Sequence, residues 1–421
     1  MNFKSFSFAD SILSALEKMG YESLTPVQKM AIPHVRRGHD VLASAQTGTG
    51  KTAAFALPII QKLLDSNANG ESIRAVILAP TRELVDQIDH NIKQFTAFNN
   101  LKSVAIFGGV EHDKQINRVN KGCDILVATP GRLIEHLRKG NFALNNACHV
   151  VLDEADRMLD MGFRSDIETI LEQCDKNKQT LLFSATYPSA VKQFATKALK
   201  NPKIVQVSRD NETASTITHV AYPVSNDRKL ELLSELICRK GWKQVLVFVN
   251  MKEDVQLIVD ELTQYGVTVG VMHGDKSQGN RRRALREFKE GKTTILVGTE
   301  VAARGLDIAG LPRVINFDLP YLAEDYVHRI GRTGRAGQKG FAISLVSREE
   351  EHVLAQIEDL IQDKVKRIYY PGFEVSNRDG LIKKIGKKTS LQKRIRSNRA
   401  TQYGAEAKMQ NRQKIRKAFK K

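Results

Sequence analysis

The chain has 421 residues, which is too long for one ordinary domain, and at about 150 residues per domain it should form two or three. Hydrophobic residues make up 41% of it, enough for sizeable cores, yet no uninterrupted apolar run approaches membrane-spanning length. The formal net charge of +18 favours a polyanionic partner such as nucleic acid over an acidic small molecule.

The cysteines and the N-terminal segment bear on the compartment. Cys123, Cys148, Cys174 and Cys238 lie too far apart for paired zinc-ligand spacing, so we expect reduced thiols with neither metal nor disulfide. Residues 1–20 lack the hydrophobic region of a signal peptide. These features predict a soluble, cytoplasmic protein.

Short β-rich runs alternate with helical patterns along the first half of the chain, which indicates a parallel sheet flanked by helices. The predicted strands are Val41–Ala45, Ala75–Ala79, Val104–Phe107, Ile125–Ala128, Val150–Leu152 and Leu181–Phe183. Between the second and third of these, one helical face carries Leu84, Val85, Ile88, Ile92 and Phe95.

The series then restarts, so the predicted fold class is α/β with two tandem domains. The second strand set is Val245–Val249, Val269–Met272, Ile295–Val297, Val314–Phe317 and Ala342–Val346. A polar stretch, Ser208–Ser215, has no apolar periodicity and is the candidate hinge. We therefore predict domains at 1–210 and 219–371, joined by a linker at 211–218.

A basic tail at 372–421 follows the second domain. From Glu374 to Lys421 there are 16 Lys or Arg against 3 Asp or Glu, so the tail holds most of the net charge. Its spaced charges and few apolar residues are typical of disordered segments that tether RNA electrostatically, although a tail that only aids solubility is the alternative.

Two motifs of the first predicted domain together indicate ATP. The segment AQTGTGKT places flexible backbone N–H groups, an ammonium and a hydroxyl where a strand meets a helix, as phosphate-binding loops do. Its residues are Ala45, Gln46, Thr47, Gly48, Thr49, Gly50, Lys51 and Thr52. The segment VLDEAD is an apolar strand that ends in carboxylates. Asp153 and Thr52 could hold Mg²⁺, largely through water, and Glu154 would lie beside the attacking water.

A basic string in the second domain, HRIGRTGR, starts at His328. Its glycines have no side chains to crowd Arg329, Arg332 and Arg335. The guanidinium groups of these arginines could therefore reach a γ-phosphate as arginine fingers. The alternative is the solvated basic start of a helix.

In their order from Phe3 to about Val346, these motifs resemble the DEAD-box RNA helicase family. The resemblance implies two tandem RecA-like domains that close around ATP, Mg²⁺ and single-stranded RNA. The compact length and basic tail also look similar to the bacterial RhlE and SrmB helicases, which suggests ribosome assembly or RNA turnover by analogy only.

The resemblance also assigns roles around the nucleotide. Gln28, the end of GYESLTPVQ, would bind the adenine edge, although Thr25 to Gln28 also fits a helix capping box. Phe3 would stack on adenine, with a packing role as the alternative, and Asp307 would bind ribose.

Coupling between hydrolysis and RNA handling would rest on other residues. They are Ser184, Ala185 and Thr186, together with Asp156, His328 and Arg329. Asp156 would pair with His328 in the closed state, and both could be solvated in the open state. One departure stands out, because Glu300 replaces the family's usual Asp and adds a methylene, so interdomain signalling could be retuned.

Candidate RNA contacts follow predicted strands, where open α/β sheets bind ligands. In the first domain they are Pro80, Thr81, Arg82, Gly108, Gly109, Thr129, Pro130, Gly131 and Arg132. In the second they are Asn250, Gln278, Arg281, Thr299 and Arg304. None reads a base edge in an obvious way, so we expect backbone and 2′-hydroxyl recognition with little sequence preference. Taken singly, the first-domain motifs are also common turns and helix caps.

The sequence thus predicts an RNA-dependent ATPase that locally unwinds short duplexes or remodels RNA–protein complexes. An ATP-gated RNA clamp or assembly factor with incidental unwinding remains an alternative, and a DNA translocase is a weaker one. Possible partners beyond RNA are ribosomal precursor particles or RNA-turnover proteins.

Overall fold

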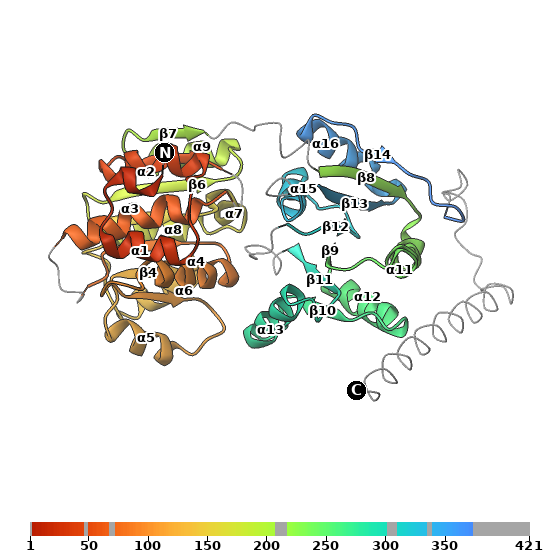
Figure 1. Cartoon of the computed structure of the whole chain (residues 1–421), viewed down its shortest axis with the longest axis horizontal. Coiled ribbons are helices and arrows are strands. Elements are labelled where there is room, and N and C mark those ends of the chain that lie inside the picture. The colour runs from red at the N-terminus through yellow and green to blue at the C-terminus, as the bar shows by residue number, and fades with distance from the viewer. Residues whose placement is uncertain are drawn as a thin grey trace. The chain divides into compact units, whose positions relative to one another are not determined.

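The computed structural model describes residues 2–45, 49–66, 72–206, 217–300, 310–334 and 339–373. These divide into two compact units: the described residues up to 206 form the first unit, and those from 217 to 373 form the second. Figure 1 shows each as a sheet covered by helices. The predicted hinge at Ser208–Ser215, nearly all of the predicted linker and the tail from Glu374 onward lie outside the described residues.

The first unit contains a seven-stranded parallel sheet with the order β3-β4-β2-β5-β6-β1-β7. Its strands are β1 (Val41–Ser44), β2 (Ala75–Leu78), β3 (Ser103–Ile106), β4 (Ile125–Ala128), β5 (His149–Leu152), β6 (Gln179–Ser184) and β7 (Lys203–Gln206). The six strands predicted from sequence are confirmed. The edge strand β7 was missed because it is short and mostly exposed, so it has no continuous apolar run.

Helices cover both faces of this sheet, each over its own hydrophobic cluster. One face carries η1 (Phe3–Phe6), α1 (Asp10–Lys18), α2 (Pro26–Arg36), α3 (Lys51–Asp65) and α4 (Arg82–Phe95). The other carries α6 (Pro130–Arg138), α7 (Ala155–Asp160), α8 (Arg164–Gln173) and α9 (Ser189–Ala198), with α5 (His112–Asn120) near the β3 edge. The apolar face predicted for α4 is fully buried in the first cluster.

The second unit repeats the plan with the order β10-β11-β9-β12-β13-β8-β14, again all parallel. Its strands are β8 (Ile217–Pro223), β9 (Val245–Val249), β10 (Val269–Met272), β11 (Ile295–Thr299), β12 (Arg313–Asn316), β13 (Gly340–Val346) and β14 (Lys366–Arg367). Its helices are η2 (Asn226–Arg228), α11 (Lys229–Lys240), α12 (Lys252–Gln264), α13 (Gln278–Lys289), α15 (Ala323–Ile330), η3 (Arg348–Glu350) and α16 (Glu351–Ile361). The sequence prediction missed β8 and β14.

The segment after β14 packs back onto the second unit. Phe373 is buried in its hydrophobic cluster, and the Arg228 guanidinium lies 4.2 Å from the Phe373 ring centroid. Arg228 also donates to the Gly372 carbonyl at 2.7 Å. The packed body therefore continues two residues beyond position 371, where the sequence placed the end of the domain.

All four cysteines are free thiols, and burial raises the pKa of Cys123 and Cys174 to about 12. Within the described part of the chain, no helix is both long and apolar enough to cross a bilayer.

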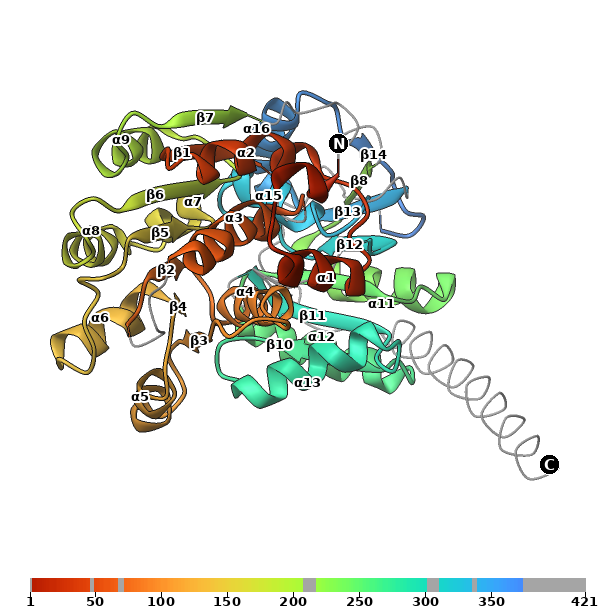
Figure 2. The same cartoon turned by 60° about the vertical axis from the view of Figure 1, so that its left-hand side comes forward.

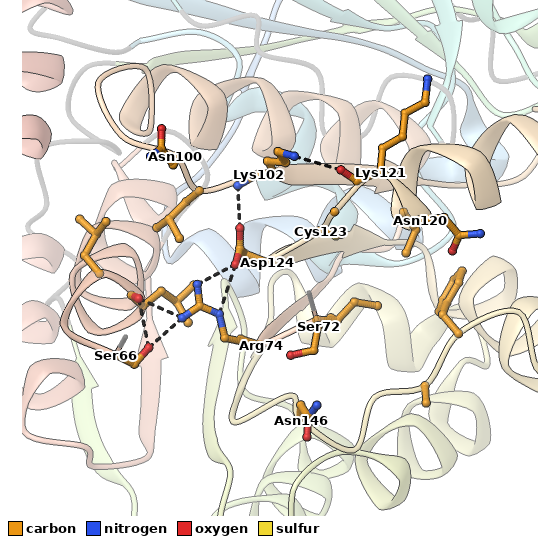
Figure 3. A pocket seen from close by; sticks show the side chains of 18 of the residues that line it. Ser66, Ser72, Arg74, Asn100, Lys102, Asn120, Lys121, Cys123, Asp124 and Asn146 are labelled. Atoms are coloured by element: carbon orange, nitrogen blue, oxygen red, sulfur yellow. Dashed lines mark hydrogen bonds and ion pairs between the residues drawn. The ribbon is translucent and has the colours of Figure 1, made fainter. Parts of the chain in front are cut away.

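A hollow lies at the amino ends of β2, β3 and β4 (Figure 3). A buried ion pair forms part of its lining, with Arg74 Nη2 2.6 Å from Asp124 Oδ1. Arg74 also donates to the Leu63 carbonyl, while the Lys102 amide donates to the Asp124 carboxylate. These bonds fasten the end of α3 to the starts of three strands, so we interpret the pair as structural.

His149, at the start of β5, should make the first unit sensitive to acid. Burial, with a smaller effect of nearby Lys62, lowers its pKa from the ordinary 6.5 to about 4. The folded state thus favours the neutral ring, whereas the unfolded chain takes up a proton below pH 6.5. Its contribution to stability is complete above pH 6.5 and is lost as the pH falls from 6.5 towards 4.

We therefore expect the unfolding temperature of the first unit to drop between pH 7 and pH 5, and His149→Gln to weaken this dependence. Thermal unfolding over that pH range is the measurement, with His90→Gln, at an exposed position of α4, as the control. Equal pH slopes for the wild type and the His149 variant would contradict the assignment.

Candidate nucleotide and RNA sites

Three neighbouring strands of the first unit bring the predicted ATP motifs to one edge. β5, β6 and β1 are adjacent in the sheet, as Figure 2 shows, and all run in the same direction. Their carboxyl ends lead into Asp153, Ala185 and Ala45 respectively. The phosphate loop, the acidic motif and the SAT triplet are therefore side by side at the edge where α/β sheets bind ligands.

Lys51 lies at the centre of this edge. Gly50 precedes it with a left-handed φ of +87°, which lets the loop turn into α3. The Lys51 side chain is only 5% exposed, and its Nζ lies 3.7 Å from Asp153 Oδ1. Among the described residues this ammonium has no hydrogen-bond partner. A buried cation with free donors suits a phosphate group.

The two leading carboxylates of the acidic motif differ in environment. Asp153 is 3% exposed, and burial raises its pKa to about 6 although Lys51 opposes the shift. Glu154 is also buried and has a left-handed φ of +53°, which is unfavourable for a residue with a Cβ. The separate metal-binding and water-activating roles expected of these two carboxylates stay predictions.

Asp156 connects the acidic motif to the SAT triplet within the first unit. Its Oδ2 accepts hydrogen bonds from the Thr186 amide at 3.0 Å and the Thr186 hydroxyl at 2.8 Å. Ser184 Oγ donates to the Thr186 carbonyl at 2.6 Å. Asp156 is buried and bonded to Thr186, two residues after the end of β6, so the solvated position considered for it is not the one found in this structure.

Gln28 is fully engaged inside the first unit. Its Oε1 accepts from the Thr25 amide at 2.9 Å, the arm of the predicted capping box, while its Nε2 donates to the Gly50 carbonyl at 3.1 Å. A Cβ at position 50 would approach Gln28 Nε2 to 2.4 Å, so the contact requires glycine there. Gln28 thus connects α2 to the phosphate loop, and its contact with adenine stays a prediction.

Phe3 has the packing role considered as its alternative. Its side chain is 4% exposed, and its ring meets Tyr21 edge-on with centroids 6.0 Å apart. Stacking on adenine stays a prediction.

The residues around Lys51 fit ATP and Mg²⁺. The unpartnered ammonium matches a phosphate, and the desolvated Asp153 carboxylate, with the Thr52 hydroxyl at the start of α3, offers the oxygen ligands that Mg²⁺ prefers. Gln46, Thr47 and Gly48 lie outside the described residues, as do Asp307 and Arg335.

The candidate RNA residues of the first unit lie on the other half of the same edge. β3, β4 and β2 are adjacent there. Shortly after their ends come Gly108–Gly109, Thr129–Arg132 and Pro80–Arg82, respectively. Pro80 and Thr81 precede α4, where the Thr81 hydroxyl accepts from the Leu84 amide. Thr129 precedes α6, which starts with Pro130 and Gly131. Thr81 is thus the helix cap expected as an alternative, whereas Thr129 occupies the cap position of α6 without a side-chain capping hydrogen bond.

Arg82 lies against the Gly108–Gly109 backbone. A Cβ at Gly109 would come within 2.3 Å of Arg82 Nη1, and Gly109 has a φ of +81°. Glycine is therefore required for this close approach. A guanidinium beside main chain without side chains is an arrangement that could contact an extended RNA backbone, and that contact stays a prediction.

Arg132 is occupied within the protein. Its guanidinium donates to Glu135 at 2.7 Å and to the Val110 carbonyl, and it contacts His112. The hydrogen bond to Glu135 also lowers the pKa of that carboxyl. Arg132 thereby braces the loop that follows Gly109, and direct contact with phosphate stays a prediction.

Sequence reasoning missed a further brace of that loop. Gln115, on α5, donates from Nε2 to the carbonyls of Phe107 and Val110, both at 3.1 Å. It is buried, but a single polar residue in a short helix with few apolar positions gives no signal of such a role.

The second unit places its candidates at its own carboxyl edge. Asn250 follows β9, and Thr299 ends the adjacent strand β11. Gln278 and Arg281 lie in the first turns of α13, which packs beside β10, and Arg281 is buried. Arg304 lies outside the described residues.

The basic motif of the second unit follows β12. His328 and Arg329 are in the last turn of α15, and Arg332 comes just after it. Arg329 and Arg332 are buried and His328 is partly exposed, so the solvated basic helix considered as an alternative is wrong for the two arginines.

Tandem parallel α/β units, the first with a phosphate loop beside an acidic strand end, define a RecA-like nucleotide-binding protein. The pattern of the DEAD/DEAH box helicase family matches residues 25–194, and that of the helicase conserved C-terminal domain matches residues 228–337. The chain belongs to the DEAD-box helicase family.

Relatives support this over most of the chain. It is 40% identical over 371 residues to the DEAD-box ATP-dependent RNA helicase CshA of Bacillus subtilis, covering 88% of this chain and 74% of that one. It is also 40% identical to CshA of Geobacillus kaustophilus, over 88% of this chain and 78% of that one. Among solved structures, Dbp5 of S. cerevisiae bound to RNA and ADP BeF3 is 31% identical with a TM-score of 0.79, covering 87% of this chain and 95% of that one.

Proposed function

We propose that this chain is an ATP-dependent RNA helicase that hydrolyses ATP on binding RNA and locally separates short duplexes or remodels RNA–protein complexes. The observation that carries the proposal is that one sheet edge places the phosphate-site residues on one half and the candidate RNA residues on the other. The unpartnered Lys51 ammonium and the Asp153 carboxylate lie beyond β1 and β5, while the Arg82–Gly109 contact lies beyond β2 and β3. One rigid sheet thereby connects the two ligands.

Each residue near the phosphates then has a role. Lys51 holds phosphate oxygens, and Thr52 and Asp153 would hold Mg²⁺, largely through water. When bound, this ion neutralises phosphate charge. Glu154 takes a proton from the attacking water. Arg332 and Arg335 stabilise the transferring phosphate. Asp156 and the SAT triplet transmit the nucleotide state, together with His328 and Arg329.

ATP hydrolysis measured with single-stranded RNA, with single-stranded DNA and with neither tests the proposal. We expect strong stimulation by RNA alone. Equal stimulation by DNA would favour a translocase, and no stimulation by either would refute the proposal. A strand-displacement assay with short and long duplexes separates local unwinding from clamping, because a clamp would hydrolyse ATP without releasing even the short strand.

The cellular setting is part of the proposal. The two CshA relatives are bacterial helicases, and by analogy we propose a cytoplasmic protein that acts in ribosome assembly or RNA turnover. We further propose the two domains and the linker predicted from the sequence, 1–210, 211–218 and 219–371, with the second domain extended to Ile217, where β8 begins, and to Phe373.

The basic tail should add RNA affinity without sequence preference. Deleting residues 374–421 removes 16 Lys or Arg, so affinity should fall and its salt dependence should flatten. Single strands give a slope of about −0.7 per neutralised phosphate, so binding titrations at several salt concentrations show how many phosphates the tail neutralises. An unchanged slope would leave the tail a role in solubility only.

A further inference from the structure

Arg329 connects the carboxyl ends of three strands of the second unit, β9, β11 and β12. It is 2% exposed, and its Nε donates to Glu300 Oε2 at 2.6 Å. Its other donors reach the Asp318 carbonyl at 2.7 Å, Asn250 Oδ1 at 2.9 Å and Asn316 Oδ1 at 3.4 Å. We call these five residues, Asn250, Glu300, Asn316, Asp318 and Arg329, the Arg329 network.

Glu300 has a distinct place in this network. Among the described residues bonded to Arg329, it alone offers a carboxylate to the guanidinium, because Asp318 binds Arg329 through its main-chain oxygen. The Asp318 carboxylate instead accepts from the main-chain N–H of Asn250 at 3.0 Å and lies 3.3 Å from Lys229 Nζ. Without Glu300, Arg329 would be a buried charge with no carboxylate partner in the network, which is strongly unfavourable.

The network contains one candidate RNA residue, Asn250, and lies next to a second, Thr299. Thr299 immediately precedes Glu300 at the end of β11. The Asn250 side chain accepts from Arg329 and donates to the Leu319 carbonyl at 2.8 Å, so both ends of its amide are used inside the unit. Asn250 therefore acts as a connection in the network. Through Arg329, Glu300 is linked to the Asn250 side chain, next to the point where Thr299 and Val249 pair at the ends of β11 and β9.

We propose that Glu300 is a positioning residue for RNA binding, whose carboxylate fixes Arg329 and through it the strand ends that carry Asn250 and Thr299. This inference rests on the proposed function. The family usually has aspartate at this position, but an aspartate here would be shorter by one C–C bond, about 1.5 Å. The 2.6 Å contact would then stretch beyond hydrogen-bond reach unless the backbone moved.

The test compares full-length Glu300→Asp and Glu300→Gln with the wild type. RNA-stimulated ATP hydrolysis is measured against single-stranded RNA at saturating ATP, and against ATP at saturating RNA. We expect Glu300→Asp to raise the half-saturating RNA concentration about tenfold, as the loss of a charge-assisted hydrogen bond implies, with kcat and the KM for ATP nearly unchanged. Glu300→Gln keeps the reach and one acceptor, so its increase should be smaller.

Glu324→Gln, at an exposed position of α15, is the matched control and should behave as the wild type. Half-saturation by RNA that is the same in both Glu300 variants and in the wild type would overturn the inference. Equal losses in kcat and in both half-saturation values, with a lowered unfolding temperature, would also overturn it, because they indicate a structural role only. A wild type without RNA stimulation would instead remove the proposed function, and this role with it.

Discussion

Replacing Glu154 with glutamine is expected to leave ATP and RNA bound while turnover falls by roughly 10² to 10⁴, the contribution typical of a general base. Glutamine keeps the size of the side chain but cannot take a proton from water. Because Glu154 is buried in a left-handed turn, an isosteric change should preserve the position of neighbouring Asp153. Single-turnover hydrolysis and equilibrium binding of ATP and RNA are the measurements.

The control for Glu154→Gln is Glu172→Gln, which makes the same chemical change at an exposed position of α8. It should hydrolyse ATP at the wild-type rate. Hydrolysis by Glu154→Gln at a rate close to that of the wild type would refute its role as the base. Loss of ATP binding in that variant would point to a structural role in the phosphate site.

The sequence predicted the sheets well because parallel strands buried on both faces leave continuous apolar runs. β2, β4 and β5 are buried along their whole length and were found. β7 and β14 are short edge strands with exposed residues, and no run of apolar letters records them. Placement of the site followed from the strands, since ligands bind beyond their carboxyl ends.

What the sequence could not predict are the partners of each polar side chain. The motifs indicated Gln28, Arg132 and Asn250 as ligand contacts, and those roles stay predictions. Hydrogen bonds within their own unit engage all three, and among these bonds only that between Gln28 and Thr25 was expected from the sequence. Gln115 and Glu300 have equally specific contacts. Gln115 belongs to no motif, and Glu300 stood out only because it departs from the usual aspartate of its motif. Buried polar groups must find partners, and the choice among nearby acceptors is decided by three-dimensional packing.

Arg332→Ala is expected to reduce kcat by about 10³ or more, within the range of 10³ to 10⁵ attributed to arginine fingers. Arg332 is buried after α15, where its backbone carbonyl accepts from the Leu311 amide at 3.1 Å. That backbone bond survives truncation of the side chain, so the local turn should persist. RNA-stimulated hydrolysis at saturating ATP and RNA is the measurement, with thermal unfolding to verify the fold.

Two further variants decide how Arg332 acts. Arg332→Lys keeps the charge but loses the planar fork that matches phosphate oxygens, so it should recover only a small part of the rate. Arg348→Ala, at an exposed position, removes one positive charge from the same unit and should hydrolyse ATP normally. A kcat of Arg332→Ala within tenfold of the wild-type value would refute the proposal that this arginine stabilises the transferring phosphate. Full recovery in Arg332→Lys would indicate that a point charge is sufficient there.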